Sequence, residues 1–467
     1  MAAAPDDERR HPVTARAHVR ALCDPGTFTE LFGLMDPSET PPLGPDAREP
    51  DVVGGFGSVA GRPVCVVAQC VPPPDGGLGW VRGAEKLALV LDTAVRMDVP
   101  LVVVDDGGRP PSPADGVEAL AAAGRVLCAQ VAASGAVPQV VVTLRPGAGV
   151  AATCAAQADL QVRVGEDDPR AHLVASDVED AFDCVRRLVS YLPSSATSEL
   201  PVRHSPTSDE PTDADLELDG LLPRAASQPY DVRDVVERVL DDGVLLELQP
   251  GHAANIVTGL GEVGGVPVGV VANQPSMLAG TLDIDASEKA ARFVRTCDAF
   301  HLPVVTFVDV PGFLPGVDQE QQGIIRRGAK LLFAYAEATV PLVTVTMRKA
   351  FGGAQVVMGS RHLGADLSIA WPSAQIAVMG AAGAVQLVHR AELARVRAAG
   401  GDETARLAAL AAEYEERLLH PYVAASRGFV DMVVEPHRTR LVVTAALHAL
   451  SGKRSRLAER KHENVPL

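Results

Sequence analysis

The sequence has 467 residues, of which 47% are hydrophobic and 22% charged, and its formal net charge is −17. This composition is typical of a globular protein. The acidic balance disfavours nucleic acid or an anionic membrane surface as the main partner.

The cysteines, the histidines and the first residues together indicate a cytoplasmic protein without a metal site. The seven cysteines are dispersed and form no CxxC pair, and no two of the twelve histidines lie at ligand spacing. We therefore expect reduced, buried thiols. The first residues lack the apolar segment of a signal peptide, and no apolar run reaches the roughly 18 residues of a membrane helix.

The first half of the chain predicts a lead-in helix, a hairpin, a helix and a buried strand, in that order. Residues 13–24 suit a short helix, and Gly61 supplies a hairpin turn before the valine-rich strand 64–69. Residues 85–97 have apolar positions at i, i+3 and i+4, which indicates a helix. An apolar run at 101–104 then predicts a strand buried on both faces.

The second half predicts the same order after a linker. Residues 194–220 are rich in Ser, Thr, Pro and acidic residues and have few core-forming side chains. Residues 232–243 suit a second lead-in helix, 268–273 a strand and 287–300 a helix. A further buried strand is expected at 304–308.

The two halves also match residue by residue. Residues 52–69, VVGGFGSVAGRPVCVVAQ, recur as IVTGLGEVGGVPVGVVAN at 256–273, which is 204 positions later. Residues 137–151, VPQVVVTLRPGAGVA, recur as VPLVTVTMRKAFGGA at 340–354. A steady offset indicates two copies of one fold. The repeated β-β-α order predicts a coiled stack of short strands with outer helices, rather than a plain Rossmann sheet.

The strongest candidate site is Arg348–Ala354, which follows a predicted strand at 342–347 and contains Gly352-Gly353-Ala354. Adjacent glycines at such a junction let backbone N–H groups face a ligand oxygen. Donors fixed in this way stabilise a developing oxyanion. A tight turn chosen only for packing is the alternative. The glycine at the aligned position of the first copy, Gly149, favours the functional interpretation.

A second candidate is the loop and helix at 308–332, in which Asp309 and two Pro-Gly turns follow a strand. Its basic residues Arg326, Arg327 and Lys330 suit a phosphate or a carboxylate, or else a solvated helix face. The sequence contains no GxSxG, P-loop or HExxH motif. The chemistry is therefore expected to rest on backbone donors and a bound cofactor.

On these motifs the chain resembles the carboxyltransferase (β) subunits of biotin-dependent acyl-CoA carboxylases, of the propionyl-CoA and acetyl-CoA carboxylase type. The resemblance covers nearly the whole chain and is strongest between residues 249 and 436. The matching segments are Asn273–Pro275, Ala279–Phe300, Val308–Glu320, Gly323–Pro341, Arg348–Ala354, Ala370–Val385 and His420–Asp431.

The resemblance implies an α/β fold of tandem, duplicated crotonase-like β-β-α superhelix domains. Residues 1–193 would be the acyl-CoA half, 194–229 a linker and 230–467 the biotin half. The implied reaction moves a carboxyl group from carboxybiotin to the α carbon of an acyl-CoA. Biotin would be carried by a separate protein or subunit. The implied partners are a biotin carboxylase/biotin carrier (α) subunit and other β subunits, in a homo-hexamer or a mixed hexamer.

The resemblance also implies roles for individual residues. The backbone of Gly352-Gly353-Ala354 would hold the biotin ureido oxygen, and that of Gly149-Val150 the thioester enolate. Val356 falls at the position that tunes the choice of acyl chain. The other residues implied in substrate or biotin binding are Phe313, Gly323, Ile324, Gly380, Ala381, Gly76 and Gly77.

The first half departs from the family pattern. Family members have a Gly-Gly pair where this chain has Gly149-Val150, and three prolines precede Asp75-Gly76-Gly77. A valine fits such a loop only if its φ and ψ suit a β-branched residue. Two alternatives therefore stay open. One is a non-catalytic or half-active partner of another β subunit. The other is a biotin-independent crotonase-type decarboxylase acting on a malonyl-type thioester.

Overall fold

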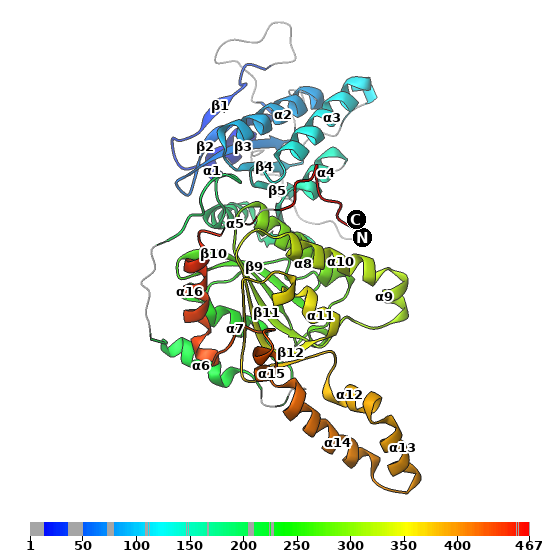
Figure 1. The fold of residues 1–467 in the computed structure, drawn as a ribbon. Helices are drawn as coiled ribbons and strands as arrows, with labels where there is room; N and C mark the ends of the chain where they lie inside the picture. Colours follow the sequence, from blue (N-terminus) through cyan, green and yellow to red (C-terminus); the bar gives the residue numbers. More distant parts are fainter. Residues whose placement is uncertain are drawn as a thin grey trace, which may run out of the picture. The chain divides into compact units, whose positions relative to one another are not determined.

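The computed structural model describes residues 14–35, 50–71, 79–107, 111, 113–145, 147, 149–165, 168–203, 210–223, 225, 228–453, 455 and 457–466. The chain forms two compact units, Met1–Pro201 and Val202–Leu467 (Figure 1). Each unit is built on one mixed β-sheet with helices packed against it. The predicted duplication of an α/β fold is therefore confirmed.

The first unit has a seven-stranded sheet in which the strands follow one another in chain order. The first three strands are antiparallel neighbours, and the later ones are parallel. The strands are β1 Thr29–Leu31, β2 Val52–Val59, β3 Arg62–Cys70, β4 Leu101–Asp106, β5 Gln139–Arg145, β6 Leu160–Val164 and β7 Leu173–Ala175. The α-helices are α1 Ala15–Leu22, α2 Trp80–Met97, α3 Gly116–Ala133, α4 Val150–Gln157 and α5 Val178–Tyr191.

The apolar run in β3 is explained by burial on both faces of the sheet. Val67 packs against Val90 of α2, while Val64 and Val66, which alternate with it along the strand, are fully buried as well. Among the described helices, only α3 is long and apolar enough to cross a membrane. A third of its apolar window is buried inside the unit, where α3 packs against α2.

The second unit has an eight-stranded sheet in the order β15-β13-β12-β11-β10-β9-β8, and β14 pairs with the end of β12. The strands are β8 Leu246–Leu248, β9 Ile256–Val263, β10 Val266–Asn273, β11 Val304–Val310, β12 Leu342–Phe351, β13 Leu367–Ala370, β14 Gln375–Ala377 and β15 Met432–Val433. The α-helices are α6 Asp213–Leu221, α7 Val232–Val239, α8 Ile284–Ala299, α9 Val317–Gln321, α10 Ile324–Glu337, α11 Gly352–Val357, α12 Ala381–Val388, α13 Arg390–Ala398, α14 Glu403–Tyr414, α15 Pro421–Ser426 and α16 Thr439–Leu450.

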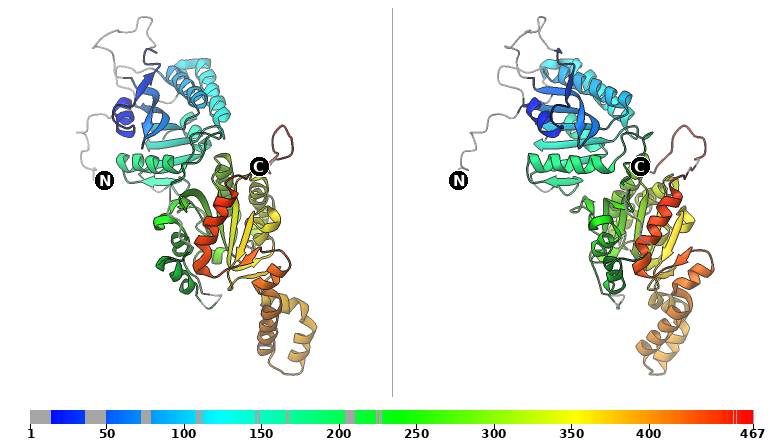
Figure 2. Two further views of the ribbon diagram at one scale, coloured as in Figure 1. Left: turned by 60° about the vertical axis from the view of Figure 1, so that its left-hand side comes forward. Right: turned by 90° about the vertical axis from the view of Figure 1, so that its left-hand side faces the viewer.

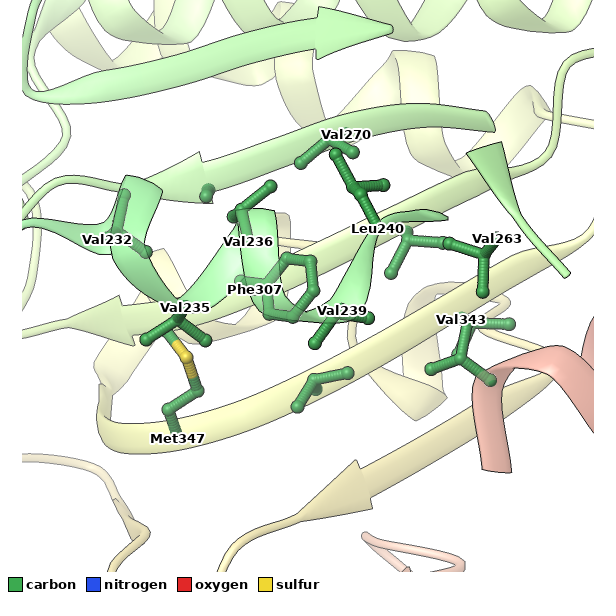
Figure 3. Packing of buried hydrophobic residues seen from close by; sticks show 14 of the residues in the cluster. Val232, Val235, Val236, Val239, Leu240, Val263, Val270, Phe307, Val343 and Met347 are labelled. Atoms are coloured by element: carbon green, nitrogen blue, oxygen red, sulfur yellow. The ribbon is translucent and has the colours of Figure 1, made fainter. Parts of the chain in front are cut away.

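The core of the second unit forms where the lead-in helix α7 lies on the sheet (Figure 3). Val232, Val235, Val236 and Val239 are all fully buried, and they cluster with Phe307 of β11. Burying each such side chain contributes about 1.5–3 kcal/mol. The i, i+3, i+4, i+7 spacing of these valines is the pattern that predicted the helix.

In both copies an aspartate carboxylate accepts a hydrogen bond from a glycine N–H in the hairpin turn. The N–H of Gly61 donates to the Asp24 carboxylate at 2.8 Å, and the N–H of Gly265 donates to Asp241 at 2.7 Å. Each aspartate follows its lead-in helix, and both glycines have positive φ, which a tight turn of this kind favours. The aspartates therefore fix the lead-in helices to the hairpins.

Helices α12, α13 and α14 form an arm that extends from the sheet of the second unit (Figures 1 and 2). The arm has its own small core, in which Val385, Leu393 and Leu410 are buried. Leu387 and Val388 on α12 are 70% and 71% exposed. The arm therefore presents apolar side chains outside the sheet core.

Three of the expected segments named above differ from the observed ones. Helices α2 and α8 begin at Trp80 and Ile284, earlier than the expected starts at 85 and 287. Part of the expected linker 194–229 is the helix α6, because Thr212 caps it and Leu218 is buried in the core of the second unit. The domain boundaries themselves stay a prediction.

Candidate functional site

The loop predicted as the biotin site joins β12 to α11. Gly352 follows the last strand residue, Phe351, and has φ +62, a left-handed conformation that favours glycine. Gly353 does not have positive φ. It lies in the first turn of α11 and is followed by the buried Ala354. The first turn of a helix leaves its N–H groups without intrahelical acceptors. The loop therefore presents backbone donors, which is the arrangement an oxyanion requires.

Phe313 lies close to this loop. A Cβ added to Gly353 would be 3.8 Å from the Phe313 ring, and one added to Gly352 would be 3.1 Å from the carbonyl oxygen of Val378. Phe313 also lines a hollow of about 340 Å³ together with Gly323 and Ile324. The structure therefore brings three of the predicted binding residues to one hollow, next to the glycine loop.

Three further predicted residues lie around the same loop. Val356, on α11, is 38% exposed. A Cβ on Gly380 would meet the Phe351 ring at 3.2 Å, and Ala381 is buried against the same ring. Gly380 and Ala381 thus support the end of β12 from the side of α12. Gly76 and Gly77, the remaining predicted residues, lie outside the described residues.

The first unit repeats Gly352-Gly353-Ala354 as Gly149-Val150-Ala151, with one substitution. Gly149 precedes α4 and has φ +62, the same value as Gly352. Val150, which aligns with Gly353, is the first residue of α4 and does not have positive φ. A β-branched residue adopts helical φ and ψ without strain of this kind. Val150 therefore does not need the positive φ that would conflict with a β-branched residue.

An acid–arginine pair precedes each loop, and the pair in the second unit is buried. In the second unit Asp309, at the end of β11, is 3.0 Å from Nε of Arg348, and both side chains are buried. The ladder changes register here, and the N–H of Lys349 donates to the Asp309 carboxylate at 3.1 Å. Asp309 thus replaces the missing ladder hydrogen bonds just before the glycine loop.

The first unit contains the same pair at an offset of 203. Arg145 donates to both oxygens of Asp106, at 2.7 and 3.1 Å, where β4 and β5 change register. The sequence analysis missed both pairs. The signal was present, because the aspartate and the arginine are identical in the two aligned copies.

Each pair has a different third partner. In the first unit Nε2 of the buried His18 lies 2.9 Å from Asp106. Burial alone would raise the pKa of Asp106, but hydrogen bonds from His18 and Arg145 lower it below its ordinary value. In the second unit Arg348 lies over the Tyr230 ring, and burial together with the Asp309 charge raises the pKa of Tyr230. The paired side chains hold the strand ends in place.

The basic cluster predicted on α10 is partly neutralised. Arg327 donates to both carboxylate oxygens of Glu288, at 2.8 and 2.6 Å, and Lys330 donates at 2.7 Å. The Arg327 hydrogen bond is the main reason why the pKa of Glu288 falls to about 2. The solvated helix face is thus the better interpretation of this cluster. Among the residues that the structure describes, no group of His, Cys, Asp and Glu could hold a metal ion.

Comparisons of the sequence and of the structure with known proteins indicate the same class of protein. A family model described as the carboxyl transferase domain matches residues 8–169 and 167–465. The solved structure of transcarboxylase 12S, a hexamer with methylmalonyl-coenzyme A bound, superimposes with a TM-score of 0.87 and 38% identity. This match covers 97% of our chain and 92% of that chain. The fold is therefore that of the crotonase-like carboxyltransferases.

Relatives with similar sequences identify the family within this class of carboxyltransferases. The propionyl-CoA carboxylase beta chain of Saccharopolyspora erythraea is 47% identical, over 97% of this chain and 90% of that protein. The methylmalonyl-CoA decarboxylase subunit alpha of Veillonella parvula is 38% identical, over 98% of this chain and 95% of that protein. The chain belongs to the carboxyltransferase family of biotin-dependent acyl-CoA carboxylase β subunits, as its motifs predicted.

Proposed function

We propose that the chain transfers a carboxyl group from carboxybiotin to the α carbon of an acyl-CoA. The observation that carries this proposal is the pair of strand-to-helix junctions, at which Gly149 and Gly352 have the same positive φ. Such a reaction develops negative charge on two oxygens, and each loop offers backbone N–H groups to one of them.

The second-unit loop suits a biotin ureido group. Gly352 and Gly353 present backbone donors without a Cβ in the way, and the hollow beside Phe313 gives space for a planar ring. Biotin, when bound, supplies the activated carboxyl group. The N–H groups of Gly352, Gly353 and Ala354 hold its ureido oxygen, while Asp309 and Arg348 keep the loop from shifting.

The first-unit loop suits the thioester. The N–H groups of Gly149 and Val150 would bind the carbonyl oxygen and stabilise the negative charge that forms there when the α proton passes to biotin that has released its carboxyl group. Val150 takes ordinary helical backbone, which weakens the reason for treating this chain as a non-catalytic or half-active partner.

Membership of the family also supports a proposal for the assembly. We propose a cytoplasmic hexamer, either of this chain alone or mixed with another β subunit, served by a biotin carboxylase/biotin carrier subunit. In this arrangement each active site combines the first unit of one copy with the second unit of another. The hexameric relative supports the assembly. The boundaries 1–193, 194–229 and 230–467 belong to the same proposal.

The test is carboxylation with labelled bicarbonate, ATP and a biotinylated carrier subunit. We expect label to enter an acyl-CoA, strictly dependent on the carrier. The absence of label with short and long acyl-CoAs, both alone and with a second β subunit, would overturn the proposal.

A second candidate is decarboxylation of a malonyl-type thioester without biotin. The 38% identical methylmalonyl-CoA decarboxylase subunit favours it. Release of CO2 from methylmalonyl-CoA by the purified chain, with no biotin protein added, would support this activity. Strict dependence on the biotin carrier would exclude it.

A further inference from the structure

The arm described above joins the rest of the second unit through a segment of π-helix. This segment, Glu415–Leu419, directly follows α14 and is followed by α15. A π-helix forms its hydrogen bonds between residues i and i+5 instead of i and i+4, and such segments are frequent at functional sites. The change of helix type alters which side chains at the base of the arm share a face.

The π-helix places Leu419 on the same face as Tyr414. Two residues that are five apart on an α-helix of 3.6 residues per turn lie about 140° apart around its axis. Hydrogen bonds from i to i+5 bring such residues back toward one face. Leu419 and Tyr414 accordingly pack in one cluster, together with Ala411 and Leu418. The π-helix thus adds a buried leucine to this face of the arm.

The same cluster contains Phe351, the last residue of β12. Its buried members are Phe351, Ala381 of α12 and Leu419. The backbone of Phe351 also pairs with Ala377 of β14, so that β14, α12 and the base of the arm all hold this residue. Tightly packed interiors have few voids and transmit displacements. Phe351 therefore cannot shift without its neighbours.

The glycine loop assigned to biotin begins at the next residue. A Cβ added to Gly352 would lie 3.1 Å from the carbonyl oxygen of Val378, and one added to Gly380 would lie 3.2 Å from the Phe351 ring. The segment between β14 and α12 thus leaves little free space beside the ring and the loop. A displacement of the ring therefore redirects the backbone N–H groups of Gly352 and Gly353.

The first unit shows no counterpart of this support among its described residues. Ala148 aligns with Phe351, so the sequence has no aromatic ring at that position. Between β6 and α5 the described residues form the short strand β7 and no helix. The ring and the arm therefore occur together in the second unit, the one whose loop suits biotin.

We propose that Leu419 and Phe351 are positioning residues for the biotin loop. The base of the arm fixes the Phe351 ring, and the ring fixes the direction of the N–H groups of Gly352–Ala354. Neither side chain has to touch biotin for this role. The inference rests on the proposed function for the identity of the ligand, although the support itself can be tested without turnover.

The first test removes the support from the side of the arm. Leu419→Ala should lower kcat for carboxylation by about tenfold or more, because small misplacements of a catalytic group are costly. The KM for acyl-CoA should stay unchanged. Leu447→Ala is the matched control, since Leu447 on α16 is 2% exposed and Leu419 is 1% exposed, but Leu447 packs in the sheet core. It should lose stability and keep wild-type kcat. Leu419→Met, which conserves volume, should restore kcat.

A second pair of variants pushes the ring from the opposite direction and serves if Leu419→Ala does not fold. Gly380 has φ −65, so Gly380→Ala introduces no backbone strain, but its methyl group would lie 3.2 Å from the Phe351 ring. Gly383→Ala adds the same group to the same helix, at an ordinary 3.7 Å from the Met379 sulfur. We expect kcat to fall in Gly380→Ala and to stay at the wild-type value in Gly383→Ala.

Hydrogen–deuterium exchange of the peptide at 348–358 reports on the loop without turnover. Leu419→Ala should speed exchange at the end of β12, and Leu447→Ala should not. Equal exchange in these two variants would overturn the inference, as would wild-type kcat in folded Leu419→Ala and Gly380→Ala proteins. If the wild-type chain carboxylates no acyl-CoA, the proposed function fails, and the exchange comparison alone then decides whether the arm holds the loop.

Discussion

Replacing Gly352 by alanine tests whether the second-unit loop works through its backbone shape. Gly352 has φ +62, and a left-handed conformation costs a non-glycine residue about 1–2 kcal/mol. The added Cβ would also lie 3.1 Å from the carbonyl oxygen of Val378, so one of the two must move. Any such movement redirects the N–H groups of the loop.

The expected losses differ in size for stability and for catalysis. The strain should lower the melting temperature by roughly 2–8 °C, because 1 kcal/mol corresponds to about 2–4 °C in a unit of this size. A misdirected oxyanion donor should lower kcat by roughly 10²–10³-fold. The assays are calorimetric melting and steady-state carboxylation with saturating carrier protein.

Gly400 provides the matched control. It has φ +70 in the turn between α13 and α14, and a Cβ there would meet no atom within 4 Å. Gly400→Ala should therefore show a comparable loss of stability with unchanged kcat. The reasoning is refuted if Gly352→Ala melts as expected yet keeps wild-type kcat, or if it melts like the wild-type protein.

Three further predictions concern the ion pairs. Asp309→Asn leaves the buried Arg348 without a counter-charge and should lower the free energy of unfolding of the second unit by about 3–5 kcal/mol in urea titrations. Asp106→Asn should lower the free energy of unfolding of the first unit by only about 1–2 kcal/mol, because the Arg145 side chain is 56% exposed. Equal losses for Asp309→Asn and Asp106→Asn would contradict this account. Glu288→Gln should lower stability by about 1–2 kcal/mol at pH 7. Because the folded pKa of Glu288 is depressed to about 2, its stabilisation is complete above the unfolded value near 4.5 and disappears as the pH falls toward 2. A difference in melting temperature that persists unchanged at pH 2 would refute the assignment.

The repeat predicted much of the fold because its signals are local. A valine-rich strand, a turn glycine such as Gly61 and the spacing of the apolar residues in α7 each depend on a few neighbouring residues. The same local patterns placed Gly149 and Gly352 at equivalent junctions. The structure then showed the same positive φ at both of them.

The remaining features depend on contacts between distant parts of the chain. A Gly-Gly pair does not reveal which residue carries positive φ, so the effect of Val150 could not be predicted. The pairing of Asp309 with Arg348 depends on a register change between two strands. The partners of Arg327 depend on how α8 packs against α10. Sequence patterns do not contain such information unless the two copies are compared position by position.

The single left-handed glycine also has a consequence for how this enzyme can be altered. Positive φ is required at residue 149 alone, so the backbone conformation at residue 150 does not demand glycine. A duplicated protein can then acquire a new substrate range in one half by point mutations, while the other half retains its original chemistry. Mutant libraries aimed at new acyl-CoA products should therefore randomise Val150 and keep Gly149 fixed.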